Sequence, residues 1–203
     1  SAGQLSDAQS EIAALGGEAA CFPTDVSEEA GVITMMRGVI DHFGRLDIVV
    51  NNAGIGLYGP LETTSADTWD RVMAVNARGT FLVCREAIPH LRRQRPAFIV
   101  NIASVVAVKG YANQSAYSAS KHAVLGMSKA LARELQADGI RVHVICPGGV
   151  DTDMAGQARP DLDRSVLMSP DEIADAVLFL VTRRGRAVID QLDLRRESAT
   201  PWA

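Results

Sequence analysis

The chain has 203 residues, of which 47% are hydrophobic and 22% are charged, and its formal net charge is −4. A chain of this length builds one well-cored domain, and we treat residues 1–203 as a single unit. The acidic balance excludes the basic surface of a nucleic-acid-binding protein. No apolar run approaches the roughly 18 residues of a membrane span, and the start is too polar for a signal peptide, so we expect a cytoplasmic protein.

Short apolar runs alternate with amphipathic segments along the whole chain. The apolar runs predict strands at 46–50, 98–103, 142–146 and 188–194. The amphipathic segments predict helices near 28–43, 66–93, 115–138 and 170–182. Near-continuous apolar strands joined by helices are typical of a parallel sheet that is covered on both faces. The sequence therefore predicts an α/β fold with three αβα layers.

Residues 148–168 follow a predicted strand and show no clear period. A loop of this length in a compact domain is usually functional or mobile, so this segment is a candidate lid. The run Ser169-Pro170-Asp171-Glu172 after it has the N-cap residue, the proline and the acids that are typical of a helix start.

The cysteines and histidines do not indicate a metal centre. Cys21, Cys84 and Cys146 are widely spaced in apolar surroundings, and we expect buried, reduced thiols. The histidines have no metal-ligand spacing with one another or with the cysteines; they are His42, His90, His122 and His143. We therefore expect no metal site.

The pattern Gly54-x-Gly56-x-x-Gly59 follows a predicted strand and imitates a dinucleotide-binding fingerprint. In the true fingerprint, a helix opens at the last glycines and its N-terminus holds the pyrophosphate. Here Pro60 and residues 61–65 come before the helical pattern starts. The pattern therefore favours a glycine-rich loop near a ligand over a pyrophosphate cradle.

Tyr117-x-x-x-Lys121 places two chemically useful side chains on one helix face. A nearby ammonium favours the phenolate and lowers the pKa of a phenol, which is otherwise near 10. The spacing alone also fits an exposed surface pair. Ser104 follows the strand at 98–103, Asn51 to Gly54 follow the preceding strand, and Asn76 lies in the helix between them. Since ligands bind at the carboxyl ends of parallel strands, these groups could polarise and protonate a carbonyl oxygen there.

Together these motifs resemble the short-chain dehydrogenase/reductase family. The resemblance rests on Asn51-Asn52-Ala53-Gly54, Asn76, Ser104, Tyr117-Ser118-Ala119-Ser120-Lys121, Pro147-Gly148-Gly149-Val150 and Thr152. It implies a Rossmann-like, doubly wound parallel sheet. It also implies an NAD(P)-dependent oxidoreductase that transfers a hydride between a nicotinamide cofactor and a secondary alcohol or ketone.

The resemblance implies a role for each catalytic residue. Tyr117 would be the general acid in reduction and the general base in oxidation, and Ser104 would orient and polarise the substrate oxygen. Lys121 would bind the nicotinamide ribose and lower the pKa of Tyr117. Asn76 would hold a water molecule that links Lys121 to solvent.

The same resemblance implies the cofactor contacts and the lid. Asp25 and Val26, at the end of a strand near Ala20, would contact adenine. The other implied contacts are Asn52, Ala53 and Gly54 at the ribose, and Pro147, Gly148, Val150 and Thr152 on the nicotinamide side, with Tyr117 and Lys121. Residues 153–168 would form the substrate lid.

The chain departs from the family pattern at both ends. The usual first strand, glycine turn, helix and second strand, about 40 residues in all, are not in this sequence. We expect them to precede Ser1 and to place two strands between the one near Ala20 and the one near Val49. The choice between NAD and NADP therefore stays open. Arg195 and Arg196, after the last strand, resemble a subgroup of NADP-using reductases of short hydroxy acids and related small alcohols, which favours NADP.

Two other functions are compatible with these residues. One is a non-catalytic nicotinamide-binding or scaffold protein on the same fold, and the other is an epimerase or dehydratase of this family. Retention of Lys121 argues against the dehalogenating relatives. We expect a small alcohol or carbonyl compound as substrate, and a homodimer or homotetramer. The oligomer follows from the resemblance and from apolar residues beyond one helix face, namely Val83, Ile88, Val124, Leu125, Met127 and Leu131.

Overall fold

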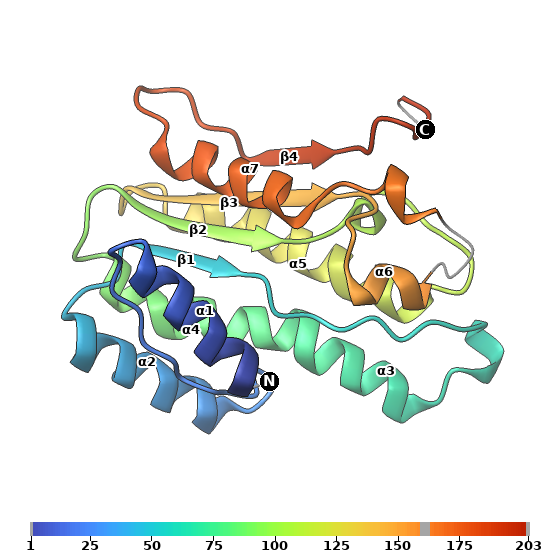
Figure 1. Cartoon of the computed structure of the whole chain (residues 1–203), viewed down its shortest axis with the longest axis horizontal. Coiled ribbons are helices and arrows are strands. Elements are labelled where there is room, and N and C mark those ends of the chain that lie inside the picture. Colours follow the sequence, from blue (N-terminus) through green and yellow to red (C-terminus); the bar gives the residue numbers. More distant parts are fainter. Residues whose placement is uncertain (1, 159–162, 202–203) are drawn as a thin grey trace.

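The computed structural model describes residues 2–158 and 163–201 (Figure 1). Four parallel strands form one sheet in the order β1-β2-β3-β4. The strands are β1 (Ile48–Asn51), β2 (Ala97–Ile102), β3 (Ile140–Pro147) and β4 (Gln191–Leu194). Helices lie on both faces, so the predicted parallel α/β fold is confirmed. None of the described helices is long and apolar enough to cross a membrane.

Helices occupy all four predicted segments, and two further helices, at 2–14 and 153–158, were not predicted. The helices are α1 (Ala2–Ala14), α2 (Glu29–Phe43), α3 (Ala66–Met73), α4 (Gly79–Leu91), α5 (Ser115–Glu134), α6 (Asp153–Ala158) and α7 (Pro170–Thr182). Short 3-10 turns occupy Leu61–Thr63, Val105–Ala107 and Arg164–Val166. The single helix predicted at 66–93 is instead two helices joined by a π-helical turn, Ala74–Arg78.

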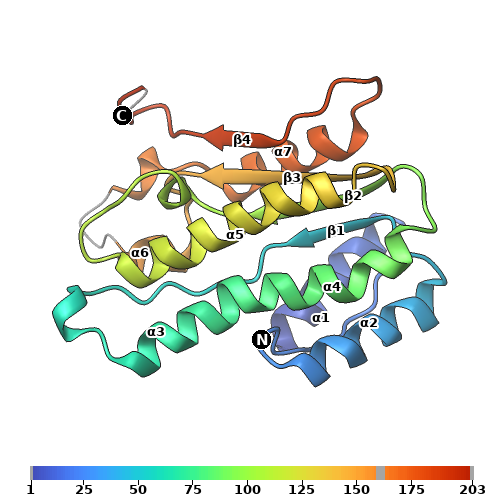
Figure 2. The ribbon, with the colours of Figure 1, turned by 180° about the vertical axis from the view of Figure 1, so that it is seen from behind.

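The two central strands explain the continuous apolar runs in the sequence. Figure 2 shows α4 and α5 on one face of the sheet, and Figure 1 shows α7 on the other. Ile99 packs into the cluster that contains Leu82 of α4, whereas its neighbour Val100 packs with Leu180 of α7. Successive side chains of a strand point to opposite faces, and here both faces are covered.

The start of α7 is determined locally. Ser169 accepts a hydrogen bond from the backbone N–H of Glu172, and the Glu172 carboxylate accepts one from the backbone N–H of Ser169. This reciprocal capping box, with Pro170 at the first helical position, confirms the helix start that the sequence predicts.

The N-terminal region differs from the rest. The residues from Gly3 to Glu18 are exposed, and no strand forms at 17–25. The strand expected near Ala20 is therefore absent from the described chain, because no neighbouring strand offers that segment backbone partners. β1 likewise pairs on one side only, with β2. The expectation that a preceding segment supplies the further strands stays a prediction.

Two sequence-based expectations about side chains need correction. Cys84 and Cys146 are buried, free thiols, but Cys21 is only half-buried. Val83, Val124, Leu125 and Leu131 are buried within this chain and do not form a surface for a second subunit. They pack against the sheet and neighbouring helices, whereas Ile88 and Met127 are half-buried, and the expectation of a homo-oligomer stays a prediction.

Candidate active site

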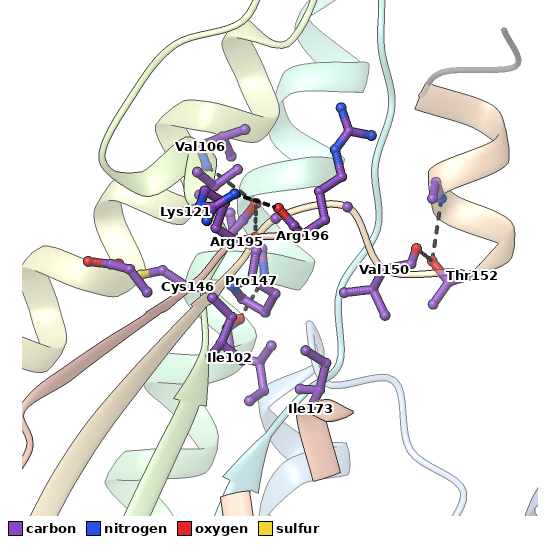
Figure 3. A pocket seen from close by; sticks show the side chains of 18 of the residues that line it. Ile102, Val106, Lys121, Cys146, Pro147, Val150, Thr152, Ile173, Arg195 and Arg196 are labelled. Atoms are coloured by element: carbon purple, nitrogen blue, oxygen red, sulfur yellow. Dashed lines mark hydrogen bonds between the residues drawn. The ribbon is translucent and has the colours of Figure 1, made fainter. Parts of the chain in front are cut away.

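A cavity of about 1840 Å³ extends from the edge of the sheet where the strands end along the sheet face between β1 and α7 (Figure 3). Its wall contains most of the predicted site residues: Asn52, Gly54, Ser104, Tyr117, Lys121, Pro147, Gly148, Val150 and Thr152. Parallel strands all direct their carboxyl ends to this edge. The topology therefore brings together residues that lie as far as 100 positions apart in the chain.

Tyr117 and Lys121 lie one above the other on the inner face of α5. Their exposed fractions are 9% and 5%, so the pair is not the exposed surface pair that the spacing also allowed. The Lys121 Nζ lies 5.8 Å from the centroid of the Tyr117 ring. It donates a hydrogen bond to the Ile102 carbonyl oxygen at 2.9 Å, which fixes the ammonium at the end of β2.

Burial dominates the protonation of this pair. Burial lowers the pKa of Lys121 to about 8. It also raises the pKa of Tyr117 above its usual value, while the Ser104 hydroxyl opposes the rise. The lowering by Lys121 that the resemblance implies stays a prediction. Desolvation penalises the phenolate, and the Lys121 ammonium is directed at the Ile102 carbonyl.

Ser104 connects the ends of β2 and β3. Its hydroxyl oxygen accepts a hydrogen bond from the backbone N–H of Val106 at 3.3 Å, which caps the 3-10 turn Val105–Ala107. The hydroxyl donates to the Pro147 carbonyl oxygen at 3.5 Å. Ser104 is half-buried and lines the cavity, so its hydroxyl is available to a bound carbonyl compound.

Asn76 lies beneath the cavity wall, in the π-helical turn, with 1% of its surface exposed. Its Oδ1 accepts a hydrogen bond from the backbone N–H of Ile55 at 2.8 Å. Its Nδ2 donates to the Ile55 carbonyl at 2.9 Å and to the Ser120 Oγ at 3.0 Å. Both ends of the amide are thus engaged by protein groups, and Asn76 ties the loop after β1 to α5.

The remaining predicted cofactor contacts fall into two groups. Val150 and Thr152 lie towards α6 in Figure 3, and Val150 forms a β-bridge with Met168. Asp25, Val26 and Ala53, in contrast, are not part of the wall of the large cavity.

Local contacts explain the position of this second group. The Asp25 carboxylate accepts hydrogen bonds from the Ser27 N–H and hydroxyl, which hold its pKa below the usual value. Val26 packs against Gly79, where an added Cβ would lie 2.8 Å from the valine side chain. Val26 and Ala53 line a separate hollow of about 10 Å³.

The predicted lid is described only in part. Met154 and Ala155 of α6 and Leu167 line the cavity. The hydrogen bonds Asp151 N–H to Met168 O and Met168 N–H to Gly149 O, at 2.8 and 3.1 Å, close the base of the segment. Residues 159–162 of the predicted lid lie outside the described residues.

Two residues of the site were not found from the sequence. Ser120 accepts from Asn76 and donates to the Tyr117 carbonyl at 2.7 Å. It lies inside the Tyr117–Lys121 motif and would have been found by asking which residue faces Asn76. Tyr58 packs against Tyr117 with a centroid distance of 5.6 Å. Its only signal is an aromatic residue within a glycine-rich loop.

The wall around Lys121 has hydrogen-bond donors and space for a bound nucleotide. An ammonium has three donors, and one of them is used by Ile102. A Cβ built on Gly54 would lie 3.6 Å from Lys121 Nζ and 3.3 Å from Asn76 Oδ1. A side chain at position 54 would therefore press on the Asn76 amide and touch the ammonium, and glycine keeps this approach open.

Comparison with known proteins shows the family of this chain. The family model described as short chain dehydrogenase matches residues 1–163. The 2-(R)-hydroxypropyl-CoM dehydrogenase of Xanthobacter autotrophicus is 40% identical over 169 residues, which cover 77% of this chain and 68% of that protein. A protein of the same organism described as an inactive 2-(S)-hydroxypropyl-CoM dehydrogenase 2 is 37% identical, with 89% of this chain and 85% of that protein covered.

Solved structures give the same result. The alcohol dehydrogenase of the archaeon Thermococcus sibiricus, complexed with 5-hydroxy-NADP, matches 99% of this chain and 85% of its own with a TM-score of 0.90 and 27% identity. A dehydrogenase/reductase from Sinorhizobium meliloti 1021 matches 96% of this chain and 80% of its own with a TM-score of 0.86 and 34% identity. The fold is therefore Rossmann-like, and the chain belongs to the short-chain dehydrogenase family of NAD(P)-dependent oxidoreductases.

Proposed function

We propose that this protein transfers a hydride between a nicotinamide cofactor and a secondary alcohol or ketone, with Tyr117 as the general acid or base. The observation that carries the proposal is the convergence of Ser104, Tyr117 and Lys121 on one cavity at the strand ends. A nicotinamide cofactor, when bound, supplies the hydride in reduction and accepts it in oxidation.

The protein's own residues would manage the charge on the substrate oxygen. The Ser104 hydroxyl donates a hydrogen bond to the carbonyl oxygen and polarises the carbonyl. The Tyr117 phenol gives its proton to that oxygen as negative charge develops, and a raised pKa keeps the phenol protonated at neutral pH. The Lys121 ammonium then stabilises the phenolate that remains and binds the ribose hydroxyls. In oxidation the same groups act in reverse.

The cofactor preference and assembly are also proposals. NADP is favoured by the arginines after β4, and the Thermococcus alcohol dehydrogenase was solved with an NADP derivative. We further propose a cytoplasmic homodimer or homotetramer and a small alcohol or carbonyl substrate. Light scattering tests the assembly, since a monomeric mass would contradict it.

The decisive experiment replaces Tyr117 by phenylalanine. We expect loss of turnover by a factor of about 10² to 10⁴, because the proton donor is removed. Absorbance of the reduced nicotinamide, followed with NADPH and NADH against a panel of carbonyl compounds, measures turnover. Cofactor affinity, measured by nicotinamide fluorescence, should stay near the wild-type value. A Tyr117→Phe variant that keeps most of its activity would overturn the assignment.

A non-catalytic, nicotinamide-binding protein is the second candidate. The observation that favours it is the similarity to a relative described as inactive. This candidate predicts measurable cofactor binding with no turnover across broad panels and with both cofactors. An epimerase or dehydratase, in contrast, would convert substrate without a net change in nicotinamide absorbance.

A further inference from the structure

The loop from Asn52 to Pro60 carries one aromatic side chain, Tyr58, over the site. The Tyr58 ring meets the Tyr117 ring in an edge-to-face arrangement, with centroids 5.6 Å apart and planes at 74°. This is the favourable geometry for two aromatic rings, because the positive edge of one meets the negative face of the other. Tyr58 lines the same cavity as Tyr117.

Gly56 makes room for this contact. A Cβ built on Gly56 would lie 2.0 Å from the Tyr58 hydroxyl oxygen and 2.4 Å from its Cζ. Its three nearest heavy atoms all belong to the Tyr58 ring or hydroxyl. Any side chain at position 56 would therefore displace Tyr58 from its place beside Tyr117.

The loop is fixed on both sides of the tyrosine. On one side, the Ile55 main chain exchanges two hydrogen bonds with the buried Asn76 amide. On the other, the Gly59 N–H donates to the Asn113 carbonyl oxygen at 2.9 Å. Tyr58 thus lies between two anchors, only a few residues from each, and its ring is held at a defined place beside Tyr117.

We propose that Tyr58 is a positioning residue that holds the Tyr117 ring and excludes water from one side of it, and that Gly56 is the residue that permits this. The proposal rests on the proposed function of Tyr117. It also assigns a role to Gly54-x-Gly56-x-x-Gly59. Gly54 gives room to the Asn76 amide, Gly56 gives room to Tyr58, and the backbone N–H of Gly59 anchors the loop, so that the loop organises a catalytic tyrosine instead of a pyrophosphate.

A double-mutant cycle tests the pairing. Tyr58→Ala and Gly56→Ala should each lower kcat for reduction by about threefold to tenfold, the effect expected for loss of one aromatic pair. KM for the cofactor should not change. The double variant should be no worse than Tyr58→Ala alone, because the Cβ at 56 then meets no ring. Losses that multiply in the double variant would overturn the pairing.

The pH profile separates positioning from a general loss of structure. Without Tyr58, water reaches Tyr117, burial decreases, and the pKa of the phenol falls towards its usual value. The pH at which reduction declines should therefore shift downwards in Tyr58→Ala. Tyr58→Phe keeps the ring edge and should keep the wild-type profile and kcat. A Tyr58→Phe variant as impaired as Tyr58→Ala would contradict the proposal.

A measurement without turnover closes the test. The chain has three tyrosines, so ring-labelled tyrosine gives few NMR signals, and single substitutions assign them. The Tyr117 ring signal should shift in Tyr58→Ala and in Gly56→Ala and stay in place in Tyr58→Phe. Gly126→Ala on α5, where an added Cβ meets nothing within 4 Å, is the matched control.

The two readouts distinguish the two possible failures. A Tyr117 signal that is unchanged in Tyr58→Ala would overturn the positioning role. If the Tyr117 signal shifts in the variants but the wild-type protein shows no turnover, the positioning role stands and the proposed function is contradicted.

Discussion

The N-terminal region and the catalytic edge of this molecule both contain large apolar side chains but differ in how these side chains are packed. Helix α1 is amphipathic in sequence, yet its described side chains, Leu5 and Ile12 among them, are exposed. At the catalytic edge, in contrast, five of the six positions of β2 are buried. An apolar pattern therefore produces a packed element only where the chain also supplies the opposing surface.

Strand β1 shows both kinds of packing, since one of its faces is buried and the other is exposed. Val49 is buried against α4, whereas Ile48 and Val50 are 40% and 44% exposed on the opposite face. The alternation shows that one face of β1 is part of the core and the other is not. All three side chains are aliphatic and β-branched, so the difference comes from the neighbours and not from the residues.

Matched leucine truncations give the largest expected contrast. Leu82→Ala, at a side chain that is 1% exposed, should lower the free energy of unfolding by about 2 to 5 kcal/mol, because it leaves a cavity in the core. Leu5→Ala in α1, at a side chain that is 38% exposed, should change it by less than about 0.5 kcal/mol. Urea denaturation monitored by circular dichroism measures both, and equal costs would remove the contrast.

Truncating Asn76 should give the next largest effect. Asn76→Ala leaves Ser120 Oγ and the Ile55 main chain without their partner, which costs about 1 to 3 kcal/mol per buried group. Ser120→Ala removes two hydrogen bonds, the one from Asn76 and the one to the Tyr117 carbonyl, but leaves the Ile55 main chain bound to Asn76 and should cost less. Hydrogen exchange at the Ile55 amide should accelerate in Asn76→Ala alone. Unchanged exchange would show that Asn76 does not hold the loop.

Helix capping offers a smaller test of the same comparison. Ser169→Ala should destabilise the protein by about 1 kcal/mol, because it removes the cap of α7, which packs on the sheet. Ser10→Ala in the exposed α1 removes a hydrogen bond to the Ser6 carbonyl and should change stability by less than about 0.5 kcal/mol. Thermal unfolding of the two variants separates these values, and a Ser10→Ala loss as large as the Ser169→Ala loss would contradict the ranking.

The smallest effect concerns pH. His143 is buried in β3, with its Nδ1 2.6 Å from the Ile189 carbonyl oxygen, and burial lowers its pKa below 6.5. The unfolded chain therefore takes up this proton first, so the stabilisation is complete above pH 6.5 and is lost as the pH falls. Between pH 7.5 and 5, Tm should fall less in His143→Gln than in the wild type. The exposed His122→Gln variant is the control and should follow the wild type.

The sequence predicted those parts of the fold whose cause is local. The central strands were found because both faces are apolar, and α7 was found because its cap lies within four residues. The strand near Ala20 was predicted wrongly, since pairing depends on a neighbour that the sequence does not show. The π-helical turn within the helix predicted at 66–93 was not predicted, because one extra residue in a single turn barely changes the spacing of the apolar residues.

The site was predictable where the spacing sets the geometry. Tyr117 and Lys121 share a helix face because residues four apart on any α-helix do so. Ser104 was found because it directly follows a predicted strand. Tyr58 was missed because its contact depends on how the loop after β1 returns over α5. The burial that raises the pKa of Tyr117 was not predictable for a similar reason, since burial depends on the whole fold.

The π-helical turn at Ala74–Arg78 carries Asn76 at the site and joins it to the part of the helix that carries Leu82 in the core. One residue corresponds to about 100° of rotation around an α-helix, and a π-turn holds one residue more than an α-turn. Deleting that residue would let α3 and α4 form one regular helix, but Asn76 and Leu82 could then not both face their present partners. Insertions and deletions in this helix should therefore be far less tolerated than substitutions. A change of one residue rotates one part of the helix relative to the other, so that Asn76 at the site and Leu82 in the core no longer face their partners together.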